Sequence, residues 1–201
     1  GNALVTGDEA ASLRDQVLSL RSKLGAIGQL QRTFLNSSTV QWVTARLLSV
    51  SHPQVVEDNV WKAELTVSFE STMNAWRSAT QTNSSVNLLN GPVSLVVNVD
   101  GLATVEDAVI TITPTGTITS LRVRGVGVDW TWTGSLASGS LVIDCGAQTV
   151  LKSGVDAYSG FVLGAGHTAQ SWLPLTPGQT VLQIDANATG TFALAHYDQY
   201  L

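Results

Sequence analysis

The sequence predicts a mainly β protein with one N-terminal helix, in which the helix packs on a β-hairpin or sheet and an antiparallel β-sandwich follows. Three observations support this fold class. Leucines occur at helical spacing near the N-terminus, apolar and polar residues alternate strictly over residues 61–70, and residues 93–201 contain short strand-like runs separated by turn sequences. We therefore expect two domains, a helix-containing β domain over residues 1–80 and a sandwich domain over residues 81–201.

The predicted helix lies in the segment TGDEAASLRDQVLSLRSKLGAIG, residues 6–28. Thr6 and Glu9 have the spacing of a capping box at its start, and Gly25 is placed to end it. Apolar residues recur between these ends at helical steps: Leu13, Val17, Leu20 and Leu24. They share one face, so the helix is amphipathic and needs an apolar surface to cover.

The hairpin over residues 40–70 offers that surface. Its second arm places one set of alternating apolar residues on a single face: Trp61, Ala63, Leu65, Val67 and Phe69. Glu57-Asp58-Asn59 supplies a turn between the two arms. We expect the helix to lie on the apolar face of this hairpin.

The domains are expected to join over residues 71–92, which lose periodicity, are rich in Ser, Thr and Asn, and close on Asn90-Gly91-Pro92. Short strands of a sandwich follow, and no helix is predicted after residue 80. Pro177-Gly178 begins the last pair of strands, which we interpret as a final hairpin that completes the sandwich.

Composition limits the possible partners. The net charge of −5 and the pI near 5.0 argue against nucleic-acid binding, because neutralising phosphates needs clustered Lys and Arg. Charged residues make up only 12% of the chain, which also has six tryptophans, so part of the exterior is expected to face other protein. Cys145 is the single cysteine, and no apolar run has the length of a bilayer span. These features favour synthesis in the cytoplasm without membrane insertion.

Catalytic chemistry has no recognisable motif in this chain, so we predict no catalytic residue, metal or cofactor. His52, His167 and His196 are isolated, and Cys145 has no partner nearby in sequence. GAGHTA, residues 164–169, lacks the third glycine and the following helix of a dinucleotide loop and is interpreted as a turn. Four acids could form a glycosidase pair but more often cap turns in strand-rich proteins: Asp129, Asp144, Asp156 and Asp185.

Trp130 and Trp132 are the best small-ligand candidates. They alternate in DWTWTG and therefore project from one face of a strand. Such a pair could stack on sugar rings, which makes a carbohydrate-binding module the alternative function. A core face or a protein contact is the more common role for such a pair, and we favour it.

An ordered series of segments resembles the siphovirus distal tail protein family, a baseplate hub component at the tip of long non-contractile phage tails. The capped helix and VWKAELTVSFESTMNAW are similar to the end of the family's first domain. GSLASGSLVIDCGAQTVLKSGVDA and WLPLTPGQTVLQIDANATGTFALAHYDQYL are similar to the strands and the Leu-x-Pro-Gly turn of its second domain. The chain departs from the family in having almost no strand before the helix, which leaves the sheet of the first domain incomplete.

The resemblance implies a virion protein made in the host cytoplasm and acting by assembly rather than catalysis. Its first domain would form a homo-oligomeric ring, six-fold in the family, and its second would be a galectin-like sandwich. Partners would be the tail tube, the hub or tail-associated protein and the receptor-binding protein, with DNA passing through the ring without specific binding. Light scattering would separate a ring from a monomeric sugar-binding module.

Overall fold

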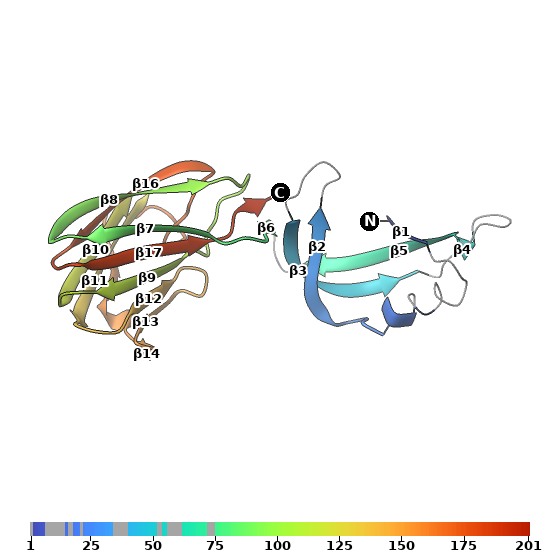
Figure 1. The fold of residues 1–201 in the computed structure, drawn as a ribbon, viewed down its shortest axis with the longest axis horizontal. Helices are drawn as coiled ribbons and strands as arrows, with labels where there is room; N and C mark the ends of the chain where they lie inside the picture. The colour runs from blue at the N-terminus through green and yellow to red at the C-terminus, as the bar shows by residue number, and fades with distance from the viewer. Residues whose placement is uncertain are drawn as a thin grey trace. The chain divides into compact units, whose positions relative to one another are not determined.

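The computed structural model describes residues 2–6, 15, 18–20, 22–33, 40–51, 54–55, 62–71 and 75–201. The chain divides into two compact units, Gly1–Trp76 and Arg77–Leu201. Both are built mainly from antiparallel strands (Figure 1), which confirms the predicted class.

The first unit is organised around strand β5 (Lys62–Ser71). β5 pairs antiparallel with β1 (Asn2–Thr6), β3 (Val40–Val50) and β4 (Gln54–Val55), while β2 (Ile27–Thr33) pairs with the other side of β3. The pairing of β3 with β5 confirms the predicted hairpin and adds a register shift between Leu47 and Ser49. The predicted turn at residues 57–59 and Trp61 lie outside the described residues.

Strand β1 corrects the expectation that almost no strand precedes the helix. Five residues, Asn2 to Thr6, pair in continuous register with Thr66 to Lys62. The strand was missed because the five residues NALVT are too few to show a period. Its partner β5 supplies the backbone hydrogen bonds that such a short segment needs.

The helix is described at Asp15 and at Leu18–Leu20, all in α-helical conformation. Gly25 has φ +80°, the left-handed conformation expected where a helix ends. Leu24 is exposed, which corrects its place on the apolar stripe: the chain has already left the helix in the turn over residues 22–25. Glu9, Leu13 and Val17 lie outside the described residues.

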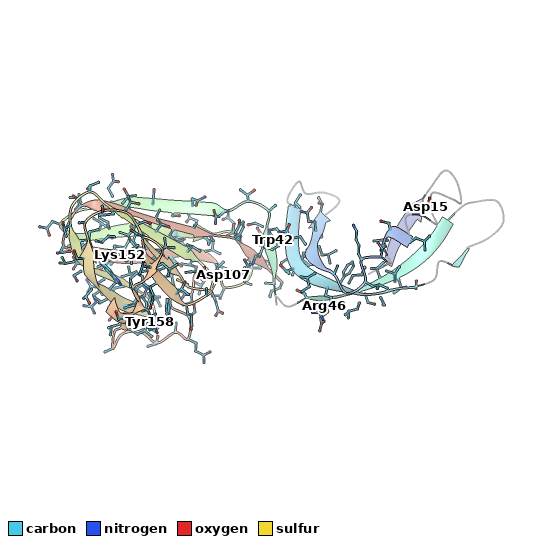
Figure 2. The ribbon with its side chains drawn as sticks, turned by 90° about the horizontal axis from the view of Figure 1, so that it is seen from below. Asp15, Trp42, Arg46, Asp107, Lys152 and Tyr158 are labelled. Atoms are coloured by element: carbon cyan, nitrogen blue, oxygen red, sulfur yellow. The ribbon has the colours of Figure 1, made fainter. Side chains whose placement is uncertain are left out.

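The sheet of the first unit has two distinct sides. Figure 2 shows Asp15 on one side of it and Arg46, which is exposed and opposite Glu70 in the register of β3 and β5, on the other. The helix therefore lies on the side away from Arg46.

The second unit contains two facing antiparallel sheets (Figure 1). The five-stranded sheet has the order β15-β11-β10-β16-β8 and the six-stranded sheet β14-β13-β12-β9-β17-β7. The first comprises β15 (Phe161–Leu163), β11 (Val128–Leu136), β10 (Ile118–Gly125), β16 (Gly178–Ala186) and β8 (Gly91–Val99). The second comprises β14 (Val155–Asp156), β13 (Thr149–Lys152), β12 (Leu141–Asp144), β9 (Val109–Pro114), β17 (Gly190–His196) and β7 (Thr82–Leu88).

Three short elements complete the description. They are the strands β6 (Trp76–Ser78) and β18 (Gln199–Tyr200) and a single 3-10 turn, η1 (Tyr158–Gly160). η1 links β14 of one sheet to β15 of the other. The chain thus changes sheets at this margin within a few residues.

Strand β7 lies within residues 71–92, the segment interpreted as the junction of the domains, in which no strand was predicted. It pairs with β17 over its full length, from Leu88 opposite Gly190 to Thr82 opposite His196. As an edge strand it carries small polar residues on its exposed side, at Asn83, Ser85 and Asn87. This polarity suits an edge but hides the strand from a search for apolar alternation.

The predicted final hairpin is also corrected. β16 pairs with β8 and β10, whereas β17 pairs with β7 and β9, so consecutive strands lie in different sheets. Asn187 holds the crossover, because its Oδ1 accepts hydrogen bonds from the backbone N–H groups of Thr119 (2.9 Å) and Ser120 (3.0 Å). Both strands present apolar residues to the same interior, so alternation alone does not distinguish a crossover from a hairpin.

Candidate functional site

Trp130 and Trp132 lie in the core of the second unit. Their side chains are 0% and 2% exposed, and they belong to the apolar cluster between the two sheets. Gly134 packs so closely on Trp132 that a Cβ there would lie 2.6 Å from the indole ring. In this conformation neither indole is available to stack on a sugar.

An aromatic series connects this core with the surface. The ring of Phe161 lies 5.2 Å from that of Trp130 and 4.4 Å from that of Trp172, and Tyr158 lies 5.8 Å from Trp172, measured between centroids. Tyr158 is exposed and is labelled in Figure 2. Sequence reasoning missed the cluster because its members come from β11, η1, β15 and the loop before β16.

Asp129 forms the best-defined polar contact on the outer side of the five-stranded sheet. Arg122 donates from Nε to Oδ1 (2.9 Å) and from Nη2 to Oδ2 (2.8 Å). The hydrogen bonds from Arg122 lower the pKa of the Asp129 carboxyl, and those same bonds raise the pKa of the Arg122 guanidinium. A glycosidase general acid needs the opposite shift, so Asp129 is unsuited to that role.

The GAGH segment covers Asp129 as a turn, which agrees with the interpretation of residues 164–169. A Cβ at Gly164 would lie 2.5 Å from Asp129 Oδ2, so only glycine fits without displacing the carboxylate. The backbone N–H of Asp129 donates to Nδ1 of His167 at 3.3 Å. Gly164 and His167 therefore hold Asp129 in place, and the segment is a turn rather than a phosphate-binding loop.

Two of the other three acids cap turns, as expected. Asp144 Oδ1 accepts from the Ala147 N–H (2.8 Å), and Asp156 Oδ1 accepts from the Tyr158 N–H (3.0 Å). Asp185 lies opposite Arg122 in the register of β10 and β16. Asp129 and Asp185 thus flank one guanidinium instead of sharing a proton.

The described histidines and the cysteine have surroundings that suit a structural role. His196 is buried, with its Nε2 3.4 Å from Asp198 Oδ1. Burial, together with Asp144 and Asp107, raises the pKa of the Cys145 thiol to about 12, so it is a poor nucleophile at neutral pH. His52 lies outside the described residues. No group of three or more potential metal ligands occurs in the part of the chain that the structure describes.

A polar hollow of about 450 Å³ lies at one end of the six-stranded sheet, lined in part by Arg77, Asp107, Asp144 and Tyr197. Arg77 forms an ion pair with Asp107, whose other carboxylate oxygen accepts from Gln199 Nε2 at 3.2 Å. Asp144 is occupied by the turn it caps. The charged groups of this hollow are thus already paired within the protein.

An apolar groove of about 260 Å³ lies on the first unit. Leu20 from the helix lines it together with Leu47 of β3 and Phe69 of β5, so the end of the helix lies against the predicted hairpin. Ile27, on strand β2, is another lining residue and is 62% exposed. The groove therefore presents apolar side chains to its surroundings rather than a closed core.

Few apolar side chains are buried in the described part of the first unit. Among its described residues the buried apolar side chains are those of Val43, Ala45, Leu47 and Val67. Exposed large apolar side chains are at least as numerous there: Leu18, Leu24, Ile27, Leu48 and Phe69. None of the helical segments that the structure describes has the length and hydropathy of a membrane span.

Comparison with known proteins identifies a shared fold but no sequence relative. No protein-family model and no curated protein matches the chain. The crystal structure of the Dit protein of phage SPP1, described as a paradigm of the hub adsorption apparatus in phages infecting Gram-positive bacteria, matches with a TM-score of 0.68 and 14% identity. That match covers 100% of this chain and 77% of Dit.

Two structures of the phage P2 baseplate in its activated conformation also match. The calcium form has a TM-score of 0.49 at 11% identity, covering 96% of this chain and 76% of that one. The strontium form has a TM-score of 0.46 at 11% identity, covering 95% and 76%. The Dit comparison extends over both units, so the resemblance to distal tail proteins is confirmed at the level of the fold.

Proposed function

We propose that the chain is a structural protein of a phage tail tip: a distal tail, or baseplate hub, protein that acts by assembly rather than catalysis. The observation that carries this proposal is the match to SPP1 Dit, which covers the whole chain and both of its units. A single sandwich module of another function would account for the second unit alone. The proposal accounts for the two units together.

The exposed apolar groove of the first unit supports a ring. A ring subunit contacts its neighbours through two unlike faces, so side chains that a monomer would leave in water become buried. Ile27 and Phe69 are both exposed in the single chain, and they suit two unlike contacts, because Phe69 shares the face of Leu47 whereas Ile27 is opposite Arg46 on the other face. We propose a homo-oligomeric ring, with six subunits as the family resemblance implies.

The second unit, on this proposal, is a galectin-like sandwich on the outside of the ring. The ring would link the tail tube to the host-recognition apparatus, through the hub or tail-associated protein and the receptor-binding protein. The net charge of −5 suits a conduit through which DNA passes without being held. The protein would thus be a virion component.

Electron microscopy and light scattering of the full chain test the proposal. We expect a closed ring of uniform size, and we expect Ile27→Asp to shift the population toward monomers because the charge would be buried at the contact. Val126→Asp is the matched control, since Val126 is 98% exposed in a turn of the second unit. A parent protein that stays monomeric at all concentrations would contradict the ring.

The carbohydrate-binding alternative has no supporting geometry. It depends on Trp130 and Trp132, and both indoles are enclosed between the sheets. We therefore do not advance it as a second function.

A further inference from the structure

The sandwich of the second unit has four edge strands, and they differ in how they are protected. Residues 77–201 are described throughout, and in them the sheets end at β14 and β15, of two and three residues, and at β7 and β8. Short edges offer few free backbone groups, and β7 is faced with Ser and Asn. Strand β8 is longer than β14 and β15, and its outer face carries an exposed valine, Val96, between two polar residues.

β8 is a long edge without charge. It has nine residues, GPVSLVVNV, and pairs on one side with β16 in unbroken register from Gly91 to Val99. The strand carries no Lys, Arg, Asp or Glu, and it shows no bulge along this pairing. Pro92 limits pairing only at its first residues. Edge strands of soluble proteins usually carry a charge or a bulge to prevent association, so this edge is suited to pairing with another strand.

The side chains of β8 are arranged symmetrically about Val96. On its outer face Ser94 and Asn98 flank Val96, which is 45% exposed. If two copies of β8 paired antiparallel with Val96 opposite Val96, each Ser94 would face an Asn98 of the other copy. Apolar residues would meet apolar residues and polar residues polar ones, with no like charges opposed.

The neighbouring strand continues the same pattern. Val181 on β16 lies opposite Val96, Gln179 opposite Asn98 and Gln183 opposite Ser94. In the pair of copies, a row of four valines would therefore cross the joint, flanked on each side by polar rows. Val181 is also exposed, so this row is available on the outer face.

We propose that β8 is a self-pairing edge: two copies of this chain join their five-stranded sheets through antiparallel β8 strands centred on Val96. We assign the partner strand to a second copy of this chain, because pairing Val96 with Val96 places the outer-face residues from Ser94 to Asn98 opposite residues of matching polarity. The joint uses the second unit and a two-fold axis, so it is separate from the ring contact proposed for the first unit and does not depend on it.

Disulfide trapping of the full chain tests the register. Opposed residues in an antiparallel sheet have Cα atoms roughly 4.5–5.5 Å apart, within the range of a disulfide. Val96→Cys is therefore expected to form a covalent dimer under mild oxidation. The native Cys145 is buried and should not compete.

Ser94→Cys is the matched control. In the proposed register the thiols that this substitution introduces in the two copies lie four positions apart, about 13 Å along the strand, so they should not be joined. Dimers of Val96→Cys at least tenfold in excess of Ser94→Cys dimers would support the register. Equal trapping of both variants would overturn the proposed register. Trapping of neither variant would overturn the self-pairing, and this is the result expected if β8 instead receives a strand from a different protein.

Light scattering without any introduced cysteine provides a second test. Val96→Lys places two lysines opposite each other and should weaken the association at least tenfold, whereas Val126→Lys on the exposed turn should leave it unchanged. Equal association of the two lysine variants would exclude the joint. A ring that persists in Val96→Lys while the pairing is lost would show that the two contacts are distinct.

Discussion

The two units of this protein bury their apolar side chains to very different degrees. The second unit encloses an extensive cluster, with Trp130, Trp132 and Phe192 among its largest members, between two sheets. The described part of the first unit buries few apolar side chains, while Ile27 and Phe69 remain exposed. The second unit therefore has a closed core within one molecule, and on the proposed assembly the exposed apolar side chains of the first unit would be covered by other chains.

The largest expected effect is on the core of the second unit. Trp132→Ala removes a buried indole and leaves a cavity, because the sheets that enclose it cannot collapse; we expect a loss of about 3–5 kcal/mol in the free energy of unfolding. Urea unfolding followed by circular dichroism measures it. A loss below about 1 kcal/mol would mean that this core is loosely packed, and the contrast between the units would fail.

Gly164→Ala should produce an intermediate effect. Its methyl group would meet the carboxylate of Asp129 at 2.5 Å, and either the turn or the ion pair with Arg122 must move. Overpacking of this kind costs about 1–3 kcal/mol. Gly116→Ala is the control in the same unit, because a Cβ at Gly116 would meet its nearest atom at 3.4 Å, an ordinary van der Waals distance. Equal destabilisation by both variants would contradict the account.

The ion pair of Asp129 predicts a smaller, pH-dependent effect in the second unit. The pKa of Asp129 is lowered by Arg122 in the folded state, so the folded pKa lies below the unfolded value near 3.9. The stabilisation is thus complete above that value and is lost as the pH falls through the folded pKa. Urea midpoints measured from pH 6 to pH 2.5 should decline less steeply in Asp129→Asn than in the parent. If the urea midpoints of the parent and of Asp129→Asn fall equally steeply with pH, the ion pair does not contribute to the stability of the fold.

Sequence reasoning predicted the paired strands of residues 40–70 because one arm alternates strictly in polarity. It missed β7 because an edge strand faced with Ser and Asn lacks that signal. It interpreted β16 and β17 as a hairpin because alternation identifies residues on one face without identifying the strand that pairs with them. Strand pairing depends on contacts far apart in sequence, such as Leu121 with Ala186.

The same limit applies to the candidate site. The pattern DWTWTG correctly placed Trp130 and Trp132 on one face, but whether that face is inside depends on the second sheet that covers it. The roles of Asp144 and Asp156 were predictable because each bonds to a backbone N–H two or three residues later. The partnership of Asp129 with Arg122 was not predictable even from strand register, because the pairing of β10 and β11 places Arg124 opposite Asp129 and Arg122 diagonal to it.

The smallest expected effect on the single chain is that of Phe69→Ala. Phe69 is 43% exposed, so its truncation removes less buried surface than Trp132→Ala and should cost about 1 kcal/mol or less when the protein is dilute and unassociated. At concentrations where the chain assembles, the same substitution should destabilise it further, because the exposed ring would then be buried by a neighbour.

Unfolding midpoints measured across a dilution series distinguish the two contributions. Trp132→Ala should show a deficit independent of concentration, since its contacts lie within one molecule, whereas the deficit of Phe69→Ala should grow with concentration. If the Phe69→Ala deficit also stays constant, the first unit does not depend on contacts with other chains.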